Sequence, residues 1–292
     1  MAISINTNSS ALNALQNLNL TTRSLEETQL RINTGLEVKS AKDNAAVFAI
    51  AQNLRADKQG LEAVKDSLNR ASSVLDISMA AAESIQDVLI QMKEKVVAAA
   101  DEGLDEDSRA ALAEDFNRLR EQIGIIAKNA TFNGTNMIDG PASPPAKPAT
   151  LIALVSPDAV NKIEVDRQDL QLKANGTTVF AATDIVQLAG DTSFTTATEA
   201  NALITNIDTS IRNVSQSLTV MGAGSKSMEL QSTFVNKLGD TLETGIGNLV
   251  DADMARESAR LQALQVKQQL GVQALSIANS QPKSILSLFG NG

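Results

Sequence analysis

The fold is decided by residues 45–100, which read AAVFAIAQNLRADKQGLEAVKDSLNRASSVLDISMAAAESIQDVLIQMKEKVVAAA. From Val47 onward every seventh residue is apolar, and the positions three residues further on continue the stripe, interrupted by Asp57 and Ser78. An apolar repeat with 3–4 spacing over this length predicts one long helix with a coiled-coil seam. At 1.5 Å per residue this helix would extend roughly 80 Å, and the sequence DEG at 101–103 then ends it.

Two further segments show the same spacing. The first follows the acidic run 105–108, whose side chains suit a helix N-terminus, and its stripe consists of Leu112, Phe116, Leu119, Ile123, Ile126 and Ala130. The second runs from Ala200 to Leu249 in alternating steps of four and three residues, and it includes the sequence MGAGSK at 221–226. Since no strand precedes these glycines, they indicate close helix packing or local flexibility rather than a phosphate loop. The sequence therefore predicts a mainly α fold, a long antiparallel coiled-coil bundle.

The segment 141–198 differs from the helical arms, because it holds five of the six prolines and many Thr and Ser residues. Its short apolar run at 151–155 and the alternating pairs Ile163/Val165 and Leu170/Leu172 are typical of strands. The dipeptide Asn-Gly at 175–176 is a hairpin-turn signal before 177–180. We expect a small β-hairpin insert of two to four strands between the long helices.

Both ends of the chain are amphipathic. Ala11, Leu18, Leu25 and Ile32 recur every seven residues near the start, and Ala263, Leu270 and Ile277 do so near the end, where Gln-Pro at 281–282 is expected to close the helix. Isolated helices of this length are marginal in water without a partner surface. A membrane-surface helix would carry Lys or Arg on its polar face and Trp or Phe on the other, so packing against protein is favoured here.

We therefore hypothesise that apolar residues of the two ends drive self-association. The alternative is that the same residues form only an intramolecular core. The residues of the predicted polymerisation interface are Ile5, Leu12, Leu15, Leu18, Leu25, Ile32, Leu261, Leu264, Leu270, Leu275 and Ile277.

The composition of the 292 residues excludes several functions. Cys, His, Trp and Tyr are absent, which rules out disulfides, zinc sites and catalysis that needs a thiol or imidazole, so we expect no enzyme, no metal and no cofactor. The net charge is −9, and residues 1–60 and 251–292 each carry +1, which leaves −11 for the middle. An acidic middle without basic clusters argues against nucleic-acid binding. The start MAISINTNSS is not a cleavable signal peptide, and no apolar run is long enough for membrane insertion.

Three groups of motifs resemble those of bacterial flagellin, the filament subunit of the flagellum. Near the start these are SINTNSSAL at 4–12, LRINTGL at 30–36 and SAKDNAA at 40–46; near the end they are NLVDADMA at 248–255, QQLG at 268–271 and ANSQP at 278–282. The C-terminal half, with Gly245 and Gly247 before Asn248, is most similar to the short flagellins of alphaproteobacteria.

This resemblance implies an architecture and a function. Residues 1–42 with 253–292 would form an inner terminal coiled-coil domain, 43–140 with 199–252 a helical-bundle domain, and 141–198 a short outer variable insert. The protein would self-assemble into the extracellular flagellar filament after type III export, with an export chaperone, cap and hook-junction proteins as further partners. The alternative is a hook–filament junction protein with similar helical ends. The metalloprotease insert of some flagellins is excluded by the absence of His.

The resemblance also points to two surface features. Gln91, Met92, Lys93 and Glu94 occupy the position of the family's immune-receptor patch, and Gln91 replaces an arginine of the family pattern, so we predict weak activation of that receptor. Flagellins are often O-glycosylated in the outer insert. The candidate sites here are Thr177, Thr178, Thr183, Thr192, Ser193, Thr195 and Thr196.

Overall fold

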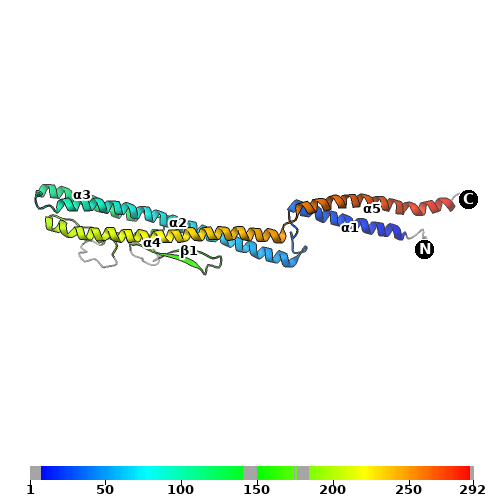
Figure 1. Cartoon of the computed structure of the whole chain (residues 1–292), viewed down its shortest axis with the longest axis horizontal. Coiled ribbons are helices and arrows are strands. Elements are labelled where there is room, and N and C mark those ends of the chain that lie inside the picture. The colour runs from blue at the N-terminus through cyan, green and yellow to red at the C-terminus, as the bar shows by residue number, and fades with distance from the viewer. Residues whose placement is uncertain (1–7, 141–149, 174, 176–183, 290–292) are drawn as a thin grey trace. The chain divides into compact units, whose positions relative to one another are not determined.

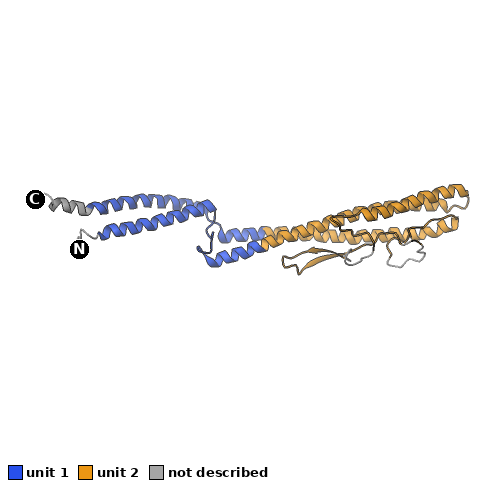
Figure 2. Ribbon diagram, turned by 180° about the vertical axis from the view of Figure 1, so that it is seen from behind, with its two compact units in different colours: residues 1–56, 240–292 blue, residues 57–239 orange. Residues whose placement is uncertain are grey.

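The computed structural model describes residues 8–140, 150–173, 175 and 184–289, apart from the side chains of 281–289. In these ranges the chain forms helices α1 (Ser9–Thr34), α2 (Ala45–Ala99), α3 (Glu106–Asn129), α4 (Ala197–Val250) and α5 (Met254–Phe289), with strands β1 (Thr150–Leu154) and β2 (Lys162–Asp166) (Figure 1). The chain divides into two compact units, residues 1–56 with 240–292 and residues 57–239 (Figure 2). The predicted fold class, a mainly helical bundle with a small β-hairpin insert, is confirmed.

The heptad pattern of α2 and α4 forms the core of the unit 57–239. The seven-residue steps Leu61, Leu68, Leu75, Ala82, Leu89 and Val96 on α2 and Ala200, Ile207, Val214, Met221, Met228 and Val235 on α4 are all buried. Of the predicted stripe between these steps, Ile204, Ile211 and Leu218 are only half-buried, whereas Ser210 and Ser217 are buried. The insert covers this side of α4, because the backbone N–H of Gln187 donates to Ser210 Oγ at 2.8 Å.

Helix α3 packs one residue away from the predicted stripe. Phe116 and Ile123 are buried as expected, but Leu112, Leu119 and Ile126 are half-buried, and the buried series continues with Ala113, Arg120 and Ala127. The N-terminus of the helix follows the sequence, since the Asp105 side chain accepts from the Ser108 N–H at 3.0 Å. Phe116 meets Phe194 of the insert edge to face, with ring centroids 5.4 Å apart, so α3 also holds the insert.

Strands β1 and β2 pair antiparallel, with Leu151 opposite Val165. Val165 is buried and lies over Gly224 of α4, where a Cβ would approach its Cγ2 atom to 2.6 Å. A third strand at Leu170 and Leu172 is not formed; the Leu170 N–H instead bonds to the carbonyl oxygen of Ile138 at 3.0 Å, because this stretch runs along the chain that leaves α3. The predicted turn at 175–176 and the segment 177–180 lie outside the described residues, except Asn175.

In the other unit, α1 and α5 lie side by side (Figure 1). A short backbone clasp joins their base: Leu36 bridges Asp251, and the Ala252 N–H donates to the Gly35 carbonyl oxygen at 2.8 Å. Gly35 ends α1 with a φ of 70°, a left-handed conformation that favours glycine. Next to the clasp, Val38, Ala51, Ile246 and Val250 form a small apolar cluster.

The predicted end of the last helix at 281–282 is wrong, since α5 continues to Phe289. A proline inside a helix has no N–H for the carbonyl four residues earlier, which here is that of Ala278. The side chain of Asn8 supplies the missing donor, because its Nδ2 lies 2.8 Å from the Ala278 carbonyl oxygen. A tertiary contact thus satisfies the group that the proline leaves free.

The terminal helix hairpin as a candidate assembly surface

Helices α1 and α5 form an antiparallel hairpin with a continuous seam. Its inward positions, spaced by three and four residues, are buried or half-buried: Ala11, Ala14, Leu18, Thr21, Leu25, Thr28 and Ile32 on α1, and Glu257, Leu261, Leu264, Gln268, Gly271, Leu275 and Ala278 on α5. Three contacts are spread along the seam, one near the start of α1, one in its middle and one near its end. Asn8 bonds to Ala278, Leu18 packs over Gly271 and Arg31 pairs with Glu257.

The predicted interface residues separate into two groups. Leu18, Leu25, Ile32, Leu261, Leu264 and Leu275 lie in the seam and are buried or half-buried within the chain. Leu12, Leu15, Leu270 and Ile277 point away from it and are 62%, 44%, 58% and 65% exposed. Ile5 lies outside the described residues. We therefore use the name outer face for the exposed aliphatic side chains of the hairpin.

Four further aliphatic side chains belong to the outer face but not to the predicted interface. Leu20, Leu30, Val266 and Val272 are 46–56% exposed. They fall between the seam positions of their helices, so a search for a single heptad stripe passes over them. The signal that could have found them is a second apolar stripe on the same helices, which a helix packed on two sides requires.

Charge is distributed unevenly along the hairpin. Residues 8–22 and 268–280 contain no Asp, Glu, Lys or Arg. The charged residues of α1 fall at 23–31, and those of α5 before residue 280 fall at 256–267. The two charge-free stretches are rich in Asn and Gln, so this half of the hairpin can be buried without removing an ionised side chain from water.

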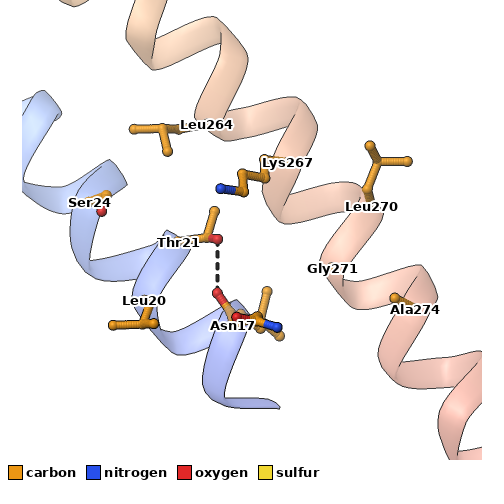
Figure 3. A pocket seen from close by; sticks show the side chains of 10 residues that line it. Asn17, Leu20, Thr21, Ser24, Leu264, Lys267, Leu270, Gly271 and Ala274 are labelled. Carbon is orange, nitrogen blue, oxygen red and sulfur yellow. Dashed lines mark hydrogen bonds between the residues drawn. The ribbon is translucent and has the colours of Figure 1, made fainter. Parts of the chain in front are cut away.

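A groove of about 500 Å³ runs between the two helices beside the outer face (Figure 3). Leu20 and Leu270 flank it, and Lys267 extends from α5 toward α1, where Thr21 bonds to the Asn17 carbonyl oxygen at 2.9 Å. Small side chains, including Ser24 and Ala274, line the rest of the groove together with Gly271. Such a groove can receive an apolar side chain of another helix, as in knobs-into-holes packing.

Elsewhere, the described residues hold no group of three or more acidic side chains placed to bind a metal ion. Among the helices described, none combines the length and apolarity needed to cross a membrane. In the insert, Asp184 and Asp169 contact the Lys173 ammonium at 3.0 and 3.2 Å; burial opposes the charge, but these carboxylates raise the pKa of Lys173. These ion pairs link residues 169, 173 and 184 of the insert.

The position of the predicted receptor patch is on α2. Gln91 and Glu94 are exposed, Met92 is buried in the bundle, and the Lys93 ammonium lies 2.6 Å from the Asp208 carboxylate of α4. The patch therefore presents a neutral amide where the family pattern has an arginine, and its lysine already has a partner within the chain.

The candidate hydroxyls of the insert differ in what they bond. Thr192 Oγ1 accepts from the Ala189 N–H, Thr195 Oγ1 donates to Glu199, and Thr196 Oγ1 accepts from the Glu199 N–H. Ser193 is exposed, and within the described chain its hydroxyl makes no hydrogen bond. Thr177, Thr178 and Thr183 lie outside the described residues.

Comparison with known proteins gives a consistent result. Residues 5–143 match the model of the bacterial flagellin N-terminal helical region, and residues 204–289 match that of the C-terminal helical region. The chain is 46% identical to flagellin FljM of Caulobacter vibrioides, with 98% of each chain covered, and 37% identical to a flagellin of Brucella melitensis, with 98% of this chain and 99% of the other covered. A solved flagellar hook-associated protein from Vibrio parahaemolyticus has a similar fold: the TM-score is 0.57 at 13% identity, over 72% of this chain and 100% of that one.

Proposed function

The chain belongs to the bacterial flagellin family, and on this basis we propose that the outer face of its α1–α5 hairpin is the surface through which copies of it assemble. As a flagellin the protein is a structural subunit of the flagellar filament, an extracellular polymer of itself. The observation that carries the proposal is the coincidence of exposed aliphatic side chains, Leu12, Leu15, Leu270 and Ile277, with the charge-free half of the hairpin.

Burial of the outer face supplies the driving force. Transfer of apolar surface out of water yields about 25 cal/mol per Å², and Leu12, Leu15, Leu270 and Ile277 offer such surface within the charge-free half of the hairpin. No ionised group has to be desolvated with them, because residues 8–22 and 268–280 carry none. A contact that joins different faces of identical chains produces an open helical polymer when its rotation does not close into a ring.

The same surface explains why the hairpin needs neighbours. Two helices with a seam of Ala, Thr, Gly and Leu bury little apolar area by themselves. The groove between α1 and α5 and the outer face remain to be filled. We propose that assembly and full ordering of the hairpin are coupled. The entropy cost of ordering the two helices would then be offset by the apolar surface that is buried between copies.

The finer points of the assignment are proposals as well. In the family's arrangement, residues 1–42 and 253–292 would form the inner domain, 43–140 and 199–252 the helical shell, and 141–198 the outer insert. Export by the flagellar type III apparatus, an export chaperone, a filament cap and hook-junction proteins would accompany this role. A hook–filament junction protein is the second candidate, favoured by the structural likeness to a hook-associated protein.

Substitution on the outer face tests the proposal. In the double variant Leu12→Lys and Leu270→Lys, two charges would have to be buried in each subunit contact, so we expect long filaments to be lost in electron micrographs of concentrated protein. The matched control Leu12→Met and Leu270→Met keeps apolar side chains of similar volume and is expected to form filaments. Circular dichroism of each chain checks that the helices are retained.

Two results would contradict the assignment. Filaments of normal length from the double lysine variant would show that the outer face is not buried between copies. Short, capped assemblies from the unmodified chain would favour the junction protein instead, because such a protein joins a limited number of copies.

A further inference from the structure

We propose that Arg31 and Glu257 are a positioning pair that fixes the register of α1 against α5. The pair thereby aligns Leu12 and Leu15 on one helix with Leu270 on the other. The register itself is a property of the single chain. Its consequence for assembly rests on the proposed function of the outer face.

Glu257 lies in the seam itself, and Arg31 reaches it from the position beside the seam residue Ile32. Arg31 Nη1 is 3.3 Å from Glu257 Oε1, and the two side chains are 19% and 7% exposed. Glu257 occupies an inward position of the same 3–4 series that continues with Leu261 and Leu264. Its second oxygen, Oε2, is buried and has no hydrogen-bond partner in the described structure.

Such a pair is poorly suited to stabilising the hairpin. A buried ion pair loses hydration that its attraction does not reliably restore, and leucine at these positions would pack without that loss. The half-satisfied carboxylate of Glu257 increases the cost. Polar residues kept in an apolar helix seam are best understood as determinants of register, because they accept one alignment and penalise the others.

The apolar pattern leaves the register open. The apolar positions of α1 recur every seven residues, so a slip of one heptad again brings equivalent positions of the two helices together. The same slip carries Glu257 from the level of Arg31 to that of Ser24, which has no charge, or past the end of α1 at Thr34. Arg31 has further partners in Glu27 at 2.8 Å and Glu37 at 3.9 Å. After the slip the buried carboxylate keeps only Arg260 of its own helix, which lies 3.8 Å away and is half exposed.

Two other features could set the register. One is the fit of Leu18 over Gly271, where a Cβ would stand 3.2 Å from Leu18 Cδ1. The other is the backbone clasp between Gly35 and Ala252 at the base of the hairpin. The experiment therefore has to change the ion pair while the clasp stays intact and the fit at 18 and 271 is equal in all variants.

Engineered thiols provide this measurement, since the chain has no cysteine of its own. The reporter carries Leu18→Cys on α1 and Leu264→Cys, Gly271→Cys and Ala278→Cys on α5. A Cβ at 271 would lie 3.9 Å from Leu18 Cβ, a disulfide distance, and so reports the native register. The thiols at 264 and 278 report a slip of one heptad in either direction, and they cannot bond to the thiol at 271 because about 10 Å of helix separates them.

The reporter is prepared in three versions and each is oxidised. The first keeps Arg31 and Glu257, the second carries Arg31→Leu and Glu257→Leu, and the third carries the exchanged pair Arg31→Glu and Glu257→Arg. Peptide mapping then gives the ratio of native to slipped disulfides, both in the isolated chain and in assembled protein. We expect the leucine pair to lower this ratio by about tenfold or more while the melting temperature is kept or raised, and the exchanged pair to restore most of the ratio.

An unchanged ratio with the leucine pair would overturn the proposal and assign the register to the clasp. A lowered disulfide ratio accompanied by a lowered melting temperature would also overturn the proposal, because the pair would then act by stabilising the hairpin rather than by selecting its register. The result is separate from the test of the outer face, since disulfide mapping within one chain does not depend on filament formation. The substitutions Leu12→Lys and Leu270→Lys are expected to leave the ratio of native to slipped disulfides unchanged, even where they abolish filaments.

Discussion

The side-chain amide of Asn8 donates a hydrogen bond to the carbonyl oxygen of Ala278, 2.8 Å away on the other helix of the hairpin. The Oδ1 atom of the same amide accepts from the Ala11 N–H at 3.1 Å and caps the N-terminus of α1. One side chain therefore serves two helices. It caps the N-terminus of α1, and it donates to the Ala278 carbonyl of α5, to which Pro282 has no N–H to donate.

Asn8→Asp separates these two roles. Aspartate is as good an N-cap as asparagine, so the first turn of α1 should keep its protection against amide exchange. It has no N–H to donate, so the backbone around Ala278 should exchange faster. Asn8→Ala removes both interactions and is expected to cost about 1 kcal/mol of helix stability or more. Equal exchange near Ala278 in the asparagine and aspartate chains would refute the shared role.

Two glycines of α4 should respond to alanine with opposite signs. At Gly224 a Cβ would come within 2.6 Å of Val165 Cγ2. Gly224→Ala should therefore push the β1–β2 hairpin away from α4, at a cost of about 1–3 kcal/mol. At Gly222 no heavy atom lies within 4 Å, so Gly222→Ala should gain about 0.5–1 kcal/mol from helix propensity.

Urea titration of the two variants checks this pair of predictions. Val165→Ala combined with Gly224→Ala should recover part of the loss, because the clash is relieved. The packing argument is wrong if the two single variants shift the midpoint in the same direction.

The N-terminus of α4 should loosen in acid. The backbone N–H of Thr195 and that of Thr196, followed by the Thr195 hydroxyl, bond to the Glu199 carboxylate and hold its pKa below the ordinary value. A group whose pKa is lowered by folding stabilises the fold above the unfolded pKa, and that contribution is lost as the pH falls through the folded pKa.

Amide exchange of Thr195 and Thr196, corrected for the intrinsic rate, should accordingly rise as the pH falls below the ordinary glutamate value of 4.5. Glu199→Gln is the matched control, since an amide oxygen can accept these bonds but does not titrate. A rise of equal size in the glutamine chain would assign the effect to another group.

Weak activation of the innate immune receptor for flagellin stays a prediction from Gln91. An amide cannot make the bidentate contacts of a guanidinium, and Lys93 is engaged with Asp208. In a reporter-cell assay the monomer should be a poor agonist, and Gln91→Arg should raise its activity. Strong activation by the unmodified monomer at low concentration would refute the prediction.

If the insert is O-glycosylated, the structure favours Ser193 among the candidates it describes. A glycan replaces the hydroxyl hydrogen, which Thr195 needs for its bond to Glu199, whereas the Ser193 hydroxyl is exposed and unbonded within the described chain. Peptide mapping of natively produced protein should place a sugar on Ser193, and Ser193→Ala should abolish it. A sugar on Thr195 with Ser193 bare would contradict this ranking.

The sequence determined the helices, because their signals are local. The 3–4 apolar repeat predicted α2 as 45–100, and the structure has Ala45–Ala99. The acidic run before α3 predicted its N-terminus, where Asp105 is the cap. The glycines at 222 and 224 were correctly read as part of a helix. Apolar period and cap chemistry act within a few residues, so no knowledge of neighbours was needed.

Only the tertiary structure decided what those helices contact. The sequence predicts that Pro282 ends α5, but the donor that satisfies the Ala278 carbonyl comes from Asn8, 270 positions from Ala278 in the chain. The predicted interface was one list of apolar residues, whereas packing of α1 on α5 buries Leu25 and leaves Leu12 exposed. Both outcomes depend on which segment lies opposite, and a periodic pattern that is compatible with several alignments does not encode that choice.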